Sequence, residues 1–215
     1  MRTLPNARPP GDETILELEP PSAALFAERV SRTLERLPWL VCHDADEMLG
    51  YAYAAPHRDR AAYQWSVEVS AYVGSGMSRG GIGRRLYDAL FEILVNQGYF
   101  NAVAGITLPN EPSVRFHEAM GFRAVGVYHC IGFKHGRWHD VVWFERPLQP
   151  RHTPTSAPVP FAEIAGSLTT FVTRSSRLPP ARLPPAFQTR IIIGSSMNPR
   201  SVCRKRAPVA PSITR

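Results

Sequence analysis

The sequence predicts an α+β fold in which helices flank a central mixed, mostly antiparallel β-sheet. Six runs have the alternation and β-branched or aromatic content of strands: 39–43, 48–55, about 64–73, 100–107, 122–134 and 139–146. Three runs have helical periodicity: about 23–37, 82–97 and about 110–120. Three strands, a helix, a strand, a helix and a hairpin, in that order, indicate one sheet with helices on its faces.

The helix boundaries follow from capping chemistry. Ser22 stands where its hydroxyl can accept the first free N–H groups of a helix, and Pro38 ends that helix. Gly98 is a stop signal for the second helix, because glycine readily adopts the left-handed conformation at a helix end. Asn110 and Pro112 are typical of the start of the third helix.

A glycine-rich turn, residues 77–85 (MSRGGIGRR), separates the third strand from the second helix. Glycines let a ligand approach the backbone, and the uncapped N–H groups and dipole of a helix start favour an anion. Arg79, Arg84 and Arg85 add positive charge. The turn therefore predicts a phosphorylated ligand, such as a cofactor.

Three phosphate-binding patterns can be compared with this turn. The P-loop requires a lysine that the turn lacks, and the Rossmann fingerprint requires a third glycine where Leu86 stands. The pattern [Q/R]-x-x-G-x-[G/A] fits at Gly81 and Gly83, with Ser78 where Gln or Arg is usual. On the turn alone, an ordinary glycine-rich surface loop remains the alternative.

The flanking segments decide between these alternatives. Residues 63–73, 104–114, 117–122 and 132–141, in this order, resemble the phosphinothricin N-acetyltransferase family of the GNAT acetyltransferase superfamily. The resemblance implies the GNAT fold, in which the strands before and after the cofactor helix splay apart and pantetheine lies between them. It also implies acetyl-CoA as co-substrate, no metal, and a small amino-acid-like amine as acceptor, of the phosphinothricin, methionine sulfone or methionine sulfoximine type.

Acetyl transfer to an amine requires an oriented thioester, removal of a proton from the ammonium group and stabilisation of the oxyanion. The resemblance places the catalytic carboxylate at Glu68. It places a substrate-contacting histidine, our second candidate base, at His117. From the residues alone, a surface-facing strand glutamate and a histidine that packs against Phe122 stay open as alternatives.

The resemblance also implies binding residues. The backbone of Ala71, Tyr72 and Val73 is expected to bond pantetheine, and the pyrophosphate is expected at Arg79, Gly80, Gly81, Ile82, Gly83 and Arg84. Asn110 is expected to hydrogen-bond the cofactor, with a helix cap as the alternative. The expected substrate-binding residues are Arg58, Arg60, Tyr63, Tyr72 and Tyr87, with a core position on its helix as the alternative for Tyr87. The two arginines could grip a carboxylate together, or they could be solvated loop residues.

Charge and proline content divide the chain. Residues 1–149 carry 15 Lys+Arg and 17 Asp+Glu, a net of −2, whereas residues 150–215 carry 10 and 1, a net of +9. The second part also holds 11 of the 21 prolines, so we expect an acetyltransferase domain at 14–149 and a disordered basic tail at 150–215. The isoleucine run 191–193 is expected to be too isolated to build a core.

Residues 1–13 are expected to be irregular, and too few to supply the strand and long helix with which the family usually begins. A truncated, non-catalytic acyl-CoA-binding protein, or an acetyltransferase that acts on a protein amine, therefore remains an alternative. The resemblance suggests a homodimer.

Cys42, Cys130 and Cys203 have no metal-binding or redox spacing, and the first two have the surroundings of small core residues. No signal-peptide h-region and no apolar run of about 18 residues occurs, which predicts a cytoplasmic protein without a membrane partner. The basic tail lacks interleaved aromatic residues, so nucleic-acid binding is not expected.

Overall fold

The computed structural model describes residues 18–19, 21–44, 47–74, 80–154, 156–172 and 190–193. Its strands are β1 (Trp39–Asp44), β2 (Glu47–Pro56), β3 (Ser66–Val73), β4 (Asn101–Thr107), β5 (Arg123–Lys134), β6 (Arg137–Pro147) and β7 (Arg190–Ile193). Its helices are α1 (Ala23–Arg36), α2 (Ile82–Gln97), α3 (Glu111–Ala119) and α4 (Phe161–Val172), with a short 3-10 helix, η1, at Ala61–Tyr63.

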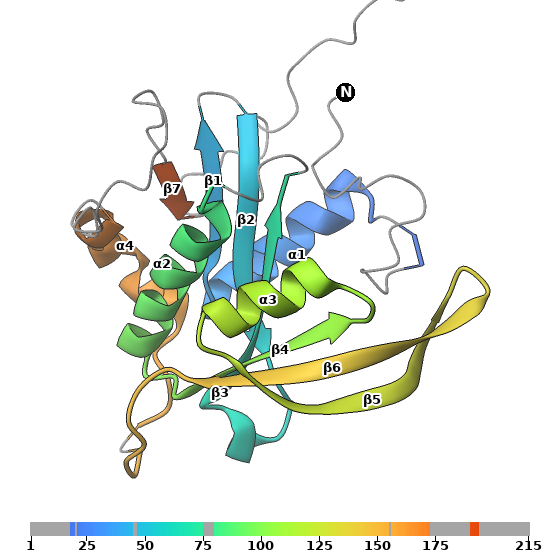
Figure 1. The fold of residues 1–215 in the computed structure, drawn as a ribbon. Helices are drawn as coiled ribbons and strands as arrows, with labels where there is room; N and C mark the ends of the chain where they lie inside the picture. Colours follow the sequence, from blue (N-terminus) through green and yellow to red (C-terminus); the bar gives the residue numbers. More distant parts are fainter. Residues whose placement is uncertain are drawn as a thin grey trace, which may run out of the picture.

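The seven strands form one mixed sheet in the order β5-β6-β4-β3-β2-β1-β7. Only the β3–β4 pair is parallel among the pairings of this sheet in the described residues. In Figure 1, α2 and α3 lie in front of the sheet and α1 lies behind it. The expected α+β architecture is confirmed.

The first helix begins at the predicted residue. The Ser22 hydroxyl accepts a hydrogen bond from the Leu25 N–H group at 3.2 Å, which satisfies one of the unpaired donors of the first turn. The apolar side of α1 covers a second, smaller core on the back of the sheet, formed by Trp39, Val41 and Tyr51. Aromatic residues of β1 and β2 thus bury one face of the sheet under this helix.

The second helix fills the main core on the opposite face. Leu86, Leu90 and Leu94 have no exposed surface, as the helical spacing of these leucines predicts. Gly98 ends α2 with a φ of 95°, and its N–H group donates to the carbonyls of Leu94 and Val95. The glycine stop is confirmed.

The two central strands pair only where they begin. The parallel ladder joins residues 66–68 of β3 to residues 101–103 of β4, whereas β2 accompanies β3 as far as Val73. Beyond Val103, β6 is the one strand of the described residues with which β4 continues to pair. The sheet therefore divides into two halves that diverge beside the start of α2, as the resemblance implied.

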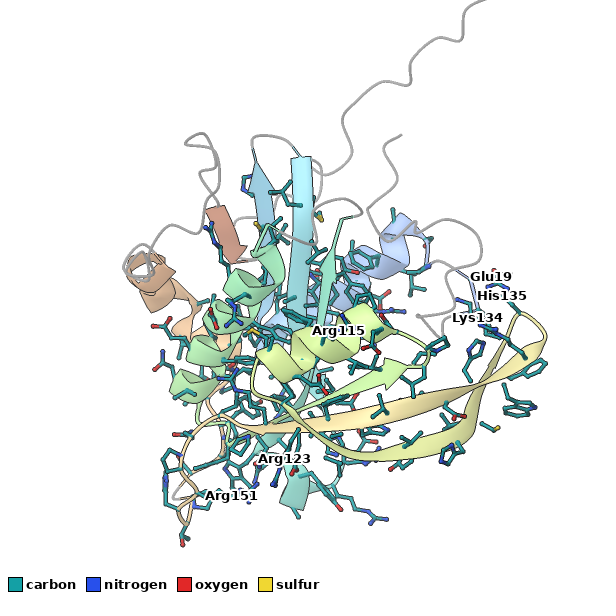
Figure 2. All side chains as sticks on the ribbon, viewed as in Figure 1. Glu19, Arg115, Arg123, Lys134, His135 and Arg151 are labelled. Atoms are coloured by element: carbon teal, nitrogen blue, oxygen red, sulfur yellow. The ribbon has the colours of Figure 1, made fainter. Side chains whose placement is uncertain are left out.

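The last two strands form a long hairpin that projects from the body of the protein. Lys134 and His135 lie at its far end, and Arg123 lies near the body (Figure 2). His135 and Gly136 have φ values of 52° and 78°, and two left-handed residues are typical of a tight hairpin turn. The predicted hairpin is confirmed.

The structure differs from the expected disordered tail at two places. Phe161, at the start of α4, is 1% exposed and belongs to the main core. The strand β7 pairs with β1 in antiparallel register, so the isoleucine run is not isolated. A proline-rich composition describes an average, and it does not reveal one aromatic side chain or one short strand that the domain can receive. Residues 1–13, 173–189 and 194–215 lie outside the described residues.

One prediction for the cysteines is wrong. Cys42 is buried as expected, but Cys130 is exposed and has a φ of 51°. The run of apolar residues around Cys130 is typical of an ordinary strand, whereas the strand is interrupted there.

Within the described residues, no helix is long and apolar enough to cross a membrane. The same part of the chain has no cluster of three His, Cys, Asp or Glu side chains that could hold a metal.

Candidate active site

Two cavities meet where β3 and β4 diverge. The first, which we call the α2 cavity, has a volume of about 420 Å³ and is lined by residues of β3, β4, the start of α2 and α3. The second, the hairpin cavity, has a volume of about 400 Å³ and is lined by residues of β3, β4, β5 and β6 together with Arg58. Both are bordered by Val69, Ser70, Tyr72, Gly105 and Thr107.

The start of α2 is suited to an anion. Gly81 occupies the cap position with a φ of 71°, and among the described residues no side-chain cap bonds the first turn. A Cβ atom on Gly83 would lie 3.1 Å from the Phe116 ring, so a larger side chain here would require that ring to move. Arg84 lines the cavity and also donates a hydrogen bond to the Ala119 carbonyl at 3.1 Å. Uncapped amides, a helix dipole and a guanidinium together favour a phosphate group.

Asn110 caps α3 and also lies at the wall of the α2 cavity. Its side-chain oxygen accepts a hydrogen bond from the Ser113 N–H group at 3.3 Å and so caps α3. The residue also lines the α2 cavity. Its position at the cavity wall comes from the capped helix, because the cap holds the side chain against the helix start.

His117 lies in the core and is bonded at both ring nitrogens. Its Nδ1 atom lies 2.8 Å from the Ser113 carbonyl oxygen, which can only accept, so Nδ1 carries the proton. Its Nε2 atom then accepts from the Tyr87 hydroxyl at 3.0 Å. Burial lowers the pKa of His117, which favours the neutral ring. The lone pair needed by a base is therefore already occupied.

Tyr87 is the buried partner of this histidine. Its side chain has no exposed surface, and it lines neither cavity. Burial raises the pKa of Tyr87, so the hydroxyl keeps its proton and serves as a donor. The expectation that Tyr87 forms a wall of the substrate pocket is wrong, because the residue lies on the inner side of α2, where the helical stripe places it in the core.

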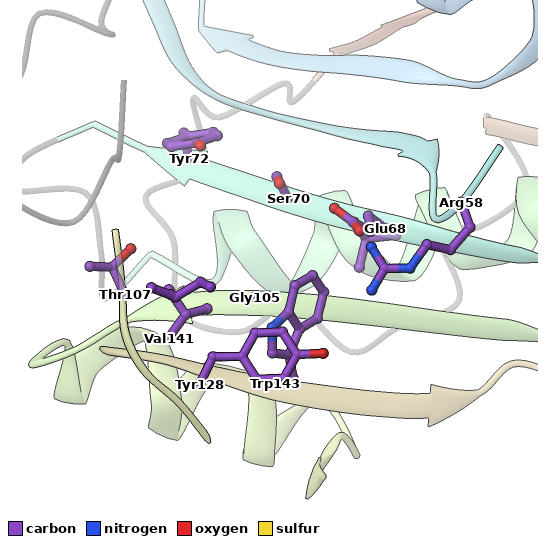
Figure 3. A pocket seen from close by; sticks show the side chains of 11 residues that line it. Arg58, Glu68, Ser70, Tyr72, Gly105, Thr107, Tyr128, Val141 and Trp143 are labelled. Carbon is purple, nitrogen blue, oxygen red and sulfur yellow. The ribbon is translucent and has the colours of Figure 1, made fainter. Parts of the chain in front are cut away.

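Glu68, Ser70 and Tyr72 project from one face of β3 into the hairpin cavity, since residues two apart on a strand share a face (Figure 3). The Arg58 side chain extends toward the same space from the loop after β2. Trp143 of β6 lies opposite. A carboxylate, a guanidinium and aromatic surface therefore surround one small cavity.

Glu68 has a partner that sequence reasoning missed. Its Oε1 atom lies 3.1 Å from Nδ1 of His57, whose side chain is 17% exposed. The His57 ring contacts the Tyr63 and Trp143 rings at centroid distances of 6.1 and 6.0 Å. Only the strand register reveals this pair, because Ala55 of β2 faces Glu68 and His57 follows two residues later.

The other expected site residues are distributed as follows. Ala71, Tyr72, Val73, Gly81, Gly83, Arg84, Asn110 and His117 line the α2 cavity, and Arg58, Glu68 and Tyr72 line the hairpin cavity. The expected pairing of two arginines is not observed: Arg60 is exposed at the start of η1 and lines neither cavity. Neither cavity is lined by Gly80, the exposed Tyr63 or Ile82, whose side chain is in the core. Arg79 lies outside the described residues.

The residues that the sequence did not identify come mostly from the last strands. Gly105 and Thr107 of β4, Tyr128 and Ile131 of β5, and Val141 and Trp143 of β6 all line the hairpin cavity. Their positions depend on how the β5–β6 hairpin pairs with β4 at the side of the sheet. No spacing of residues in the sequence predicts that pairing.

Comparison with known proteins identifies the family. Residues 15–143 match the family described as acetyltransferase (GNAT) domain. The phosphinothricin N-acetyltransferase of Streptomyces viridochromogenes is 43% identical over 137 residues, which cover 62% of this chain and 75% of that protein. The L-methionine sulfoximine/L-methionine sulfone acetyltransferase of Salmonella typhimurium is 29% identical over 144 residues, covering 62% of this chain and 84% of that protein.

A solved structure gives the same result. The GNAT superfamily phosphinothricin acetyltransferase from Sinorhizobium meliloti, crystallised in complex with AcCoA, aligns with a TM-score of 0.64 and 34% sequence identity. The alignment covers 69% of this chain and 82% of that chain. Because the family match spans more than half of the sequence and the Streptomyces viridochromogenes enzyme is 43% identical over three quarters of its length, the chain belongs to the GNAT acetyltransferases and, within them, to the phosphinothricin N-acetyltransferase family.

Proposed function

We propose that this protein transfers the acetyl group of acetyl-CoA to the amine of a small amino-acid-like acceptor of the phosphinothricin, methionine sulfone or methionine sulfoximine type. The observation that carries the proposal is the junction of the two cavities along β3. One cavity has a helix N-terminus suited to pyrophosphate, and the other has a carboxylate and a guanidinium suited to an amino acid. The shared wall would bring the two substrates into contact.

The α2 cavity fits acetyl-CoA, which supplies an activated thioester when it is bound. The first-turn amides of α2 and Arg84 would hold the pyrophosphate. The stretch of β3 that has left the ladder with β4, residues 69–73, would bind pantetheine through its backbone. Asn110 at the opposite wall supplies a further polar contact.

The acceptor's amino group reaches the protein as an ammonium ion, which cannot attack a carbonyl carbon. Glu68 is the carboxylate at the junction, and we assign it the role of the base that takes the proton. Its Oε1 atom is held by His57, which leaves Oε2 for the acceptor. Arg58 would bind the acceptor's carboxylate or phosphinate in a charge-assisted pair. The chain needs no covalent intermediate for this direct attack.

The assay that tests the proposal mixes the purified full chain with acetyl-CoA and a panel of phosphinothricin, methionine sulfone, methionine sulfoximine and protein N-terminal peptides. We expect thiol release with at least one small acceptor. If the folded protein binds CoA by calorimetry yet releases no thiol with any acceptor, the protein is a binding protein and the proposed function is wrong. Release with the peptides alone would move the acceptor class to protein amines. A homodimer and a cytoplasmic location stay predictions.

A further inference from the structure

The strand β5 is interrupted next to the hairpin cavity. Tyr128 pairs with Val141 and Gly132 pairs with His139, so the register shifts between these two pairs. Three residues of β5, 129–131, therefore stand opposite the single residue Asp140 of β6. A bulge of this kind bends the strand and redirects its side chains.

The Asp140 carboxylate is bonded to the bulge through both of its oxygens. Oδ1 accepts a hydrogen bond from the Cys130 N–H group at 2.8 Å, and Oδ2 accepts from Nδ1 of His129 at 2.9 Å. Two hydrogen bonds lower the pKa of Asp140: the one from the Cys130 amide has the larger effect, and the one from His129 the smaller. The ionised carboxylate thus replaces the ladder partners that the bulged residues have lost.

The bulge changes which side chains face the cavity. Tyr128 and Ile131 both line the hairpin cavity although they are three residues apart. In an uninterrupted strand, residues at this spacing point to opposite faces. The left-handed conformation of Cys130, with a φ of 51°, breaks the alternation and lets both side chains reach the same space.

We propose that Asp140 is a positioning residue for the acceptor: its carboxylate holds the bulge that turns both Tyr128 and Ile131 toward the acceptor. This inference rests on the proposed function, in which the hairpin cavity binds the acceptor. The Asp140 main chain has a separate task, because its carbonyl accepts the Leu108 N–H group at 2.9 Å next to the end of β4. Replacing the side chain leaves that backbone contact in place.

The kinetic test compares Asp140→Ala with wild type, using phosphinothricin as the acceptor. We expect the acceptor KM to rise roughly tenfold, which is about 1.4 kcal/mol, while kcat and the acetyl-CoA KM change less than about twofold. Asp140→Asn keeps one oxygen that can accept a hydrogen bond, but it presents an NH₂ group to the other donor of the bulge. Its KM for phosphinothricin should therefore lie between the values of wild type and Asp140→Ala. A merely structural role would lower kcat and weaken both substrates together.

A matched control is available on the same hairpin. Glu145 of β6 bonds Arg123 of β5 at 2.8 Å, in a part of the ladder where these two residues pair directly and line neither cavity. Glu145→Ala removes a carboxylate of the same strand without touching the bulge. Its acceptor KM should remain within about twofold of wild type, since exposed ion pairs contribute little. An equal increase of the acceptor KM in Asp140→Ala and Glu145→Ala would overturn the proposal.

A structural measurement separates this inference from the proposed function. In Asp140→Ala, hydrogen exchange of the Cys130 amide should accelerate at least tenfold, and a crystal structure should show Tyr128 or Ile131 turned away from the cavity. If wild type acetylates no acceptor, the proposed function fails, while these two measurements still decide the role of Asp140. Unchanged positions of both side chains in the variant would contradict the inference.

Discussion

At the scale of single residues, the proposed chemistry depends on one carboxylate of β3 that lines the hairpin cavity next to the wall shared with the α2 cavity. Glu68 is 35% exposed in its side chain, and His57 holds one of its oxygens. The strand alternation that places Glu68 beside Ser70 and Tyr72 also keeps Val67 and Val69 in the core. The carboxylate is therefore fixed by the packing of its neighbours on both sides.

Replacing this carboxylate should separate chemistry from binding. We expect Glu68→Gln to lower kcat about 10²-fold or more, because the amide cannot accept the ammonium proton. The acetyl-CoA dissociation constant should stay within about twofold, since Glu68 lies outside the α2 cavity. Steady-state kinetics and calorimetry measure the two quantities. Equal losses of turnover and cofactor affinity would remove Glu68 from the role of base.

His117 should contribute to the pH dependence of stability. Burial lowers its pKa in the folded state, so between that value and about 6.5 the unfolded chain binds more protons than the folded one. The free energy of unfolding should therefore fall as the pH falls through this window. Urea unfolding of wild type and His117→Gln at about pH 7.5 and about pH 5 measures the effect. A difference between the two pH values that is the same in both proteins would contradict it.

At the scale of elements, the site exists because β2 and β3 stay tightly paired while β3 and β4 diverge. Gly50 of β2 permits this close approach. A Cβ atom at Gly50 would lie 2.6 Å from the Tyr72 carbonyl oxygen and 3.3 Å from the Val73 Cα atom. Both of these neighbours line the α2 cavity.

Gly50→Ala should consequently displace the β3 backbone at Tyr72 and Val73, which line the α2 cavity. We expect the acetyl-CoA dissociation constant to rise roughly tenfold, and the free energy of unfolding to fall by about 1–3 kcal/mol through overpacking. Gly126→Ala on β5 is the matched control, because its added Cβ would meet nothing within 4 Å. Calorimetry and urea unfolding report both changes. If Gly50→Ala bound acetyl-CoA as tightly as wild type, a shift of β3 would not affect cofactor binding and the prediction would be wrong.

At the scale of the whole molecule, the fold extends past the acetyltransferase family match, which ends at residue 143. The helix α4 contacts α1 and α2, and its Phe161 side chain belongs to the same buried cluster as the α2 leucines. A segment that composition alone assigns to a basic tail thus completes the core. Its contribution is large enough to measure.

Phe161→Ala should lower the free energy of unfolding by about 3–5 kcal/mol, because a fully buried aromatic side chain is lost and a void remains. Val159→Ala serves as the control: this side chain is 37% exposed, and its loss should change stability by less than about 1 kcal/mol. Denaturant unfolding monitored by circular dichroism gives both values. Equal effects would mean that α4 is not integrated into the core.

Local signals in the sequence were sufficient for most elements. The serine cap of α1, the leucine stripe and glycine stop of α2 and the turn of the hairpin each depend on residues within a few positions of one another. The glycine turn before α2 was recognisable for the same reason. Predictions failed where one strand conceals a bulge, as at Cys130, and where a side chain has two plausible faces, as at Tyr87.

The sequence by itself determined the family, through the resemblance of several motifs, and also the sheet flanked by helices and the glycine-rich turn before α2, because capping, periodicity and glycine conformations are local properties of the chain. Only the tertiary structure decided which residues line the hairpin cavity. Pairs such as His57 with Glu68, or Asp140 with the bulge of β5, depend on strand register and on the direction in which a hairpin crosses the sheet. Those are non-local properties, since the packing of the whole core sets them.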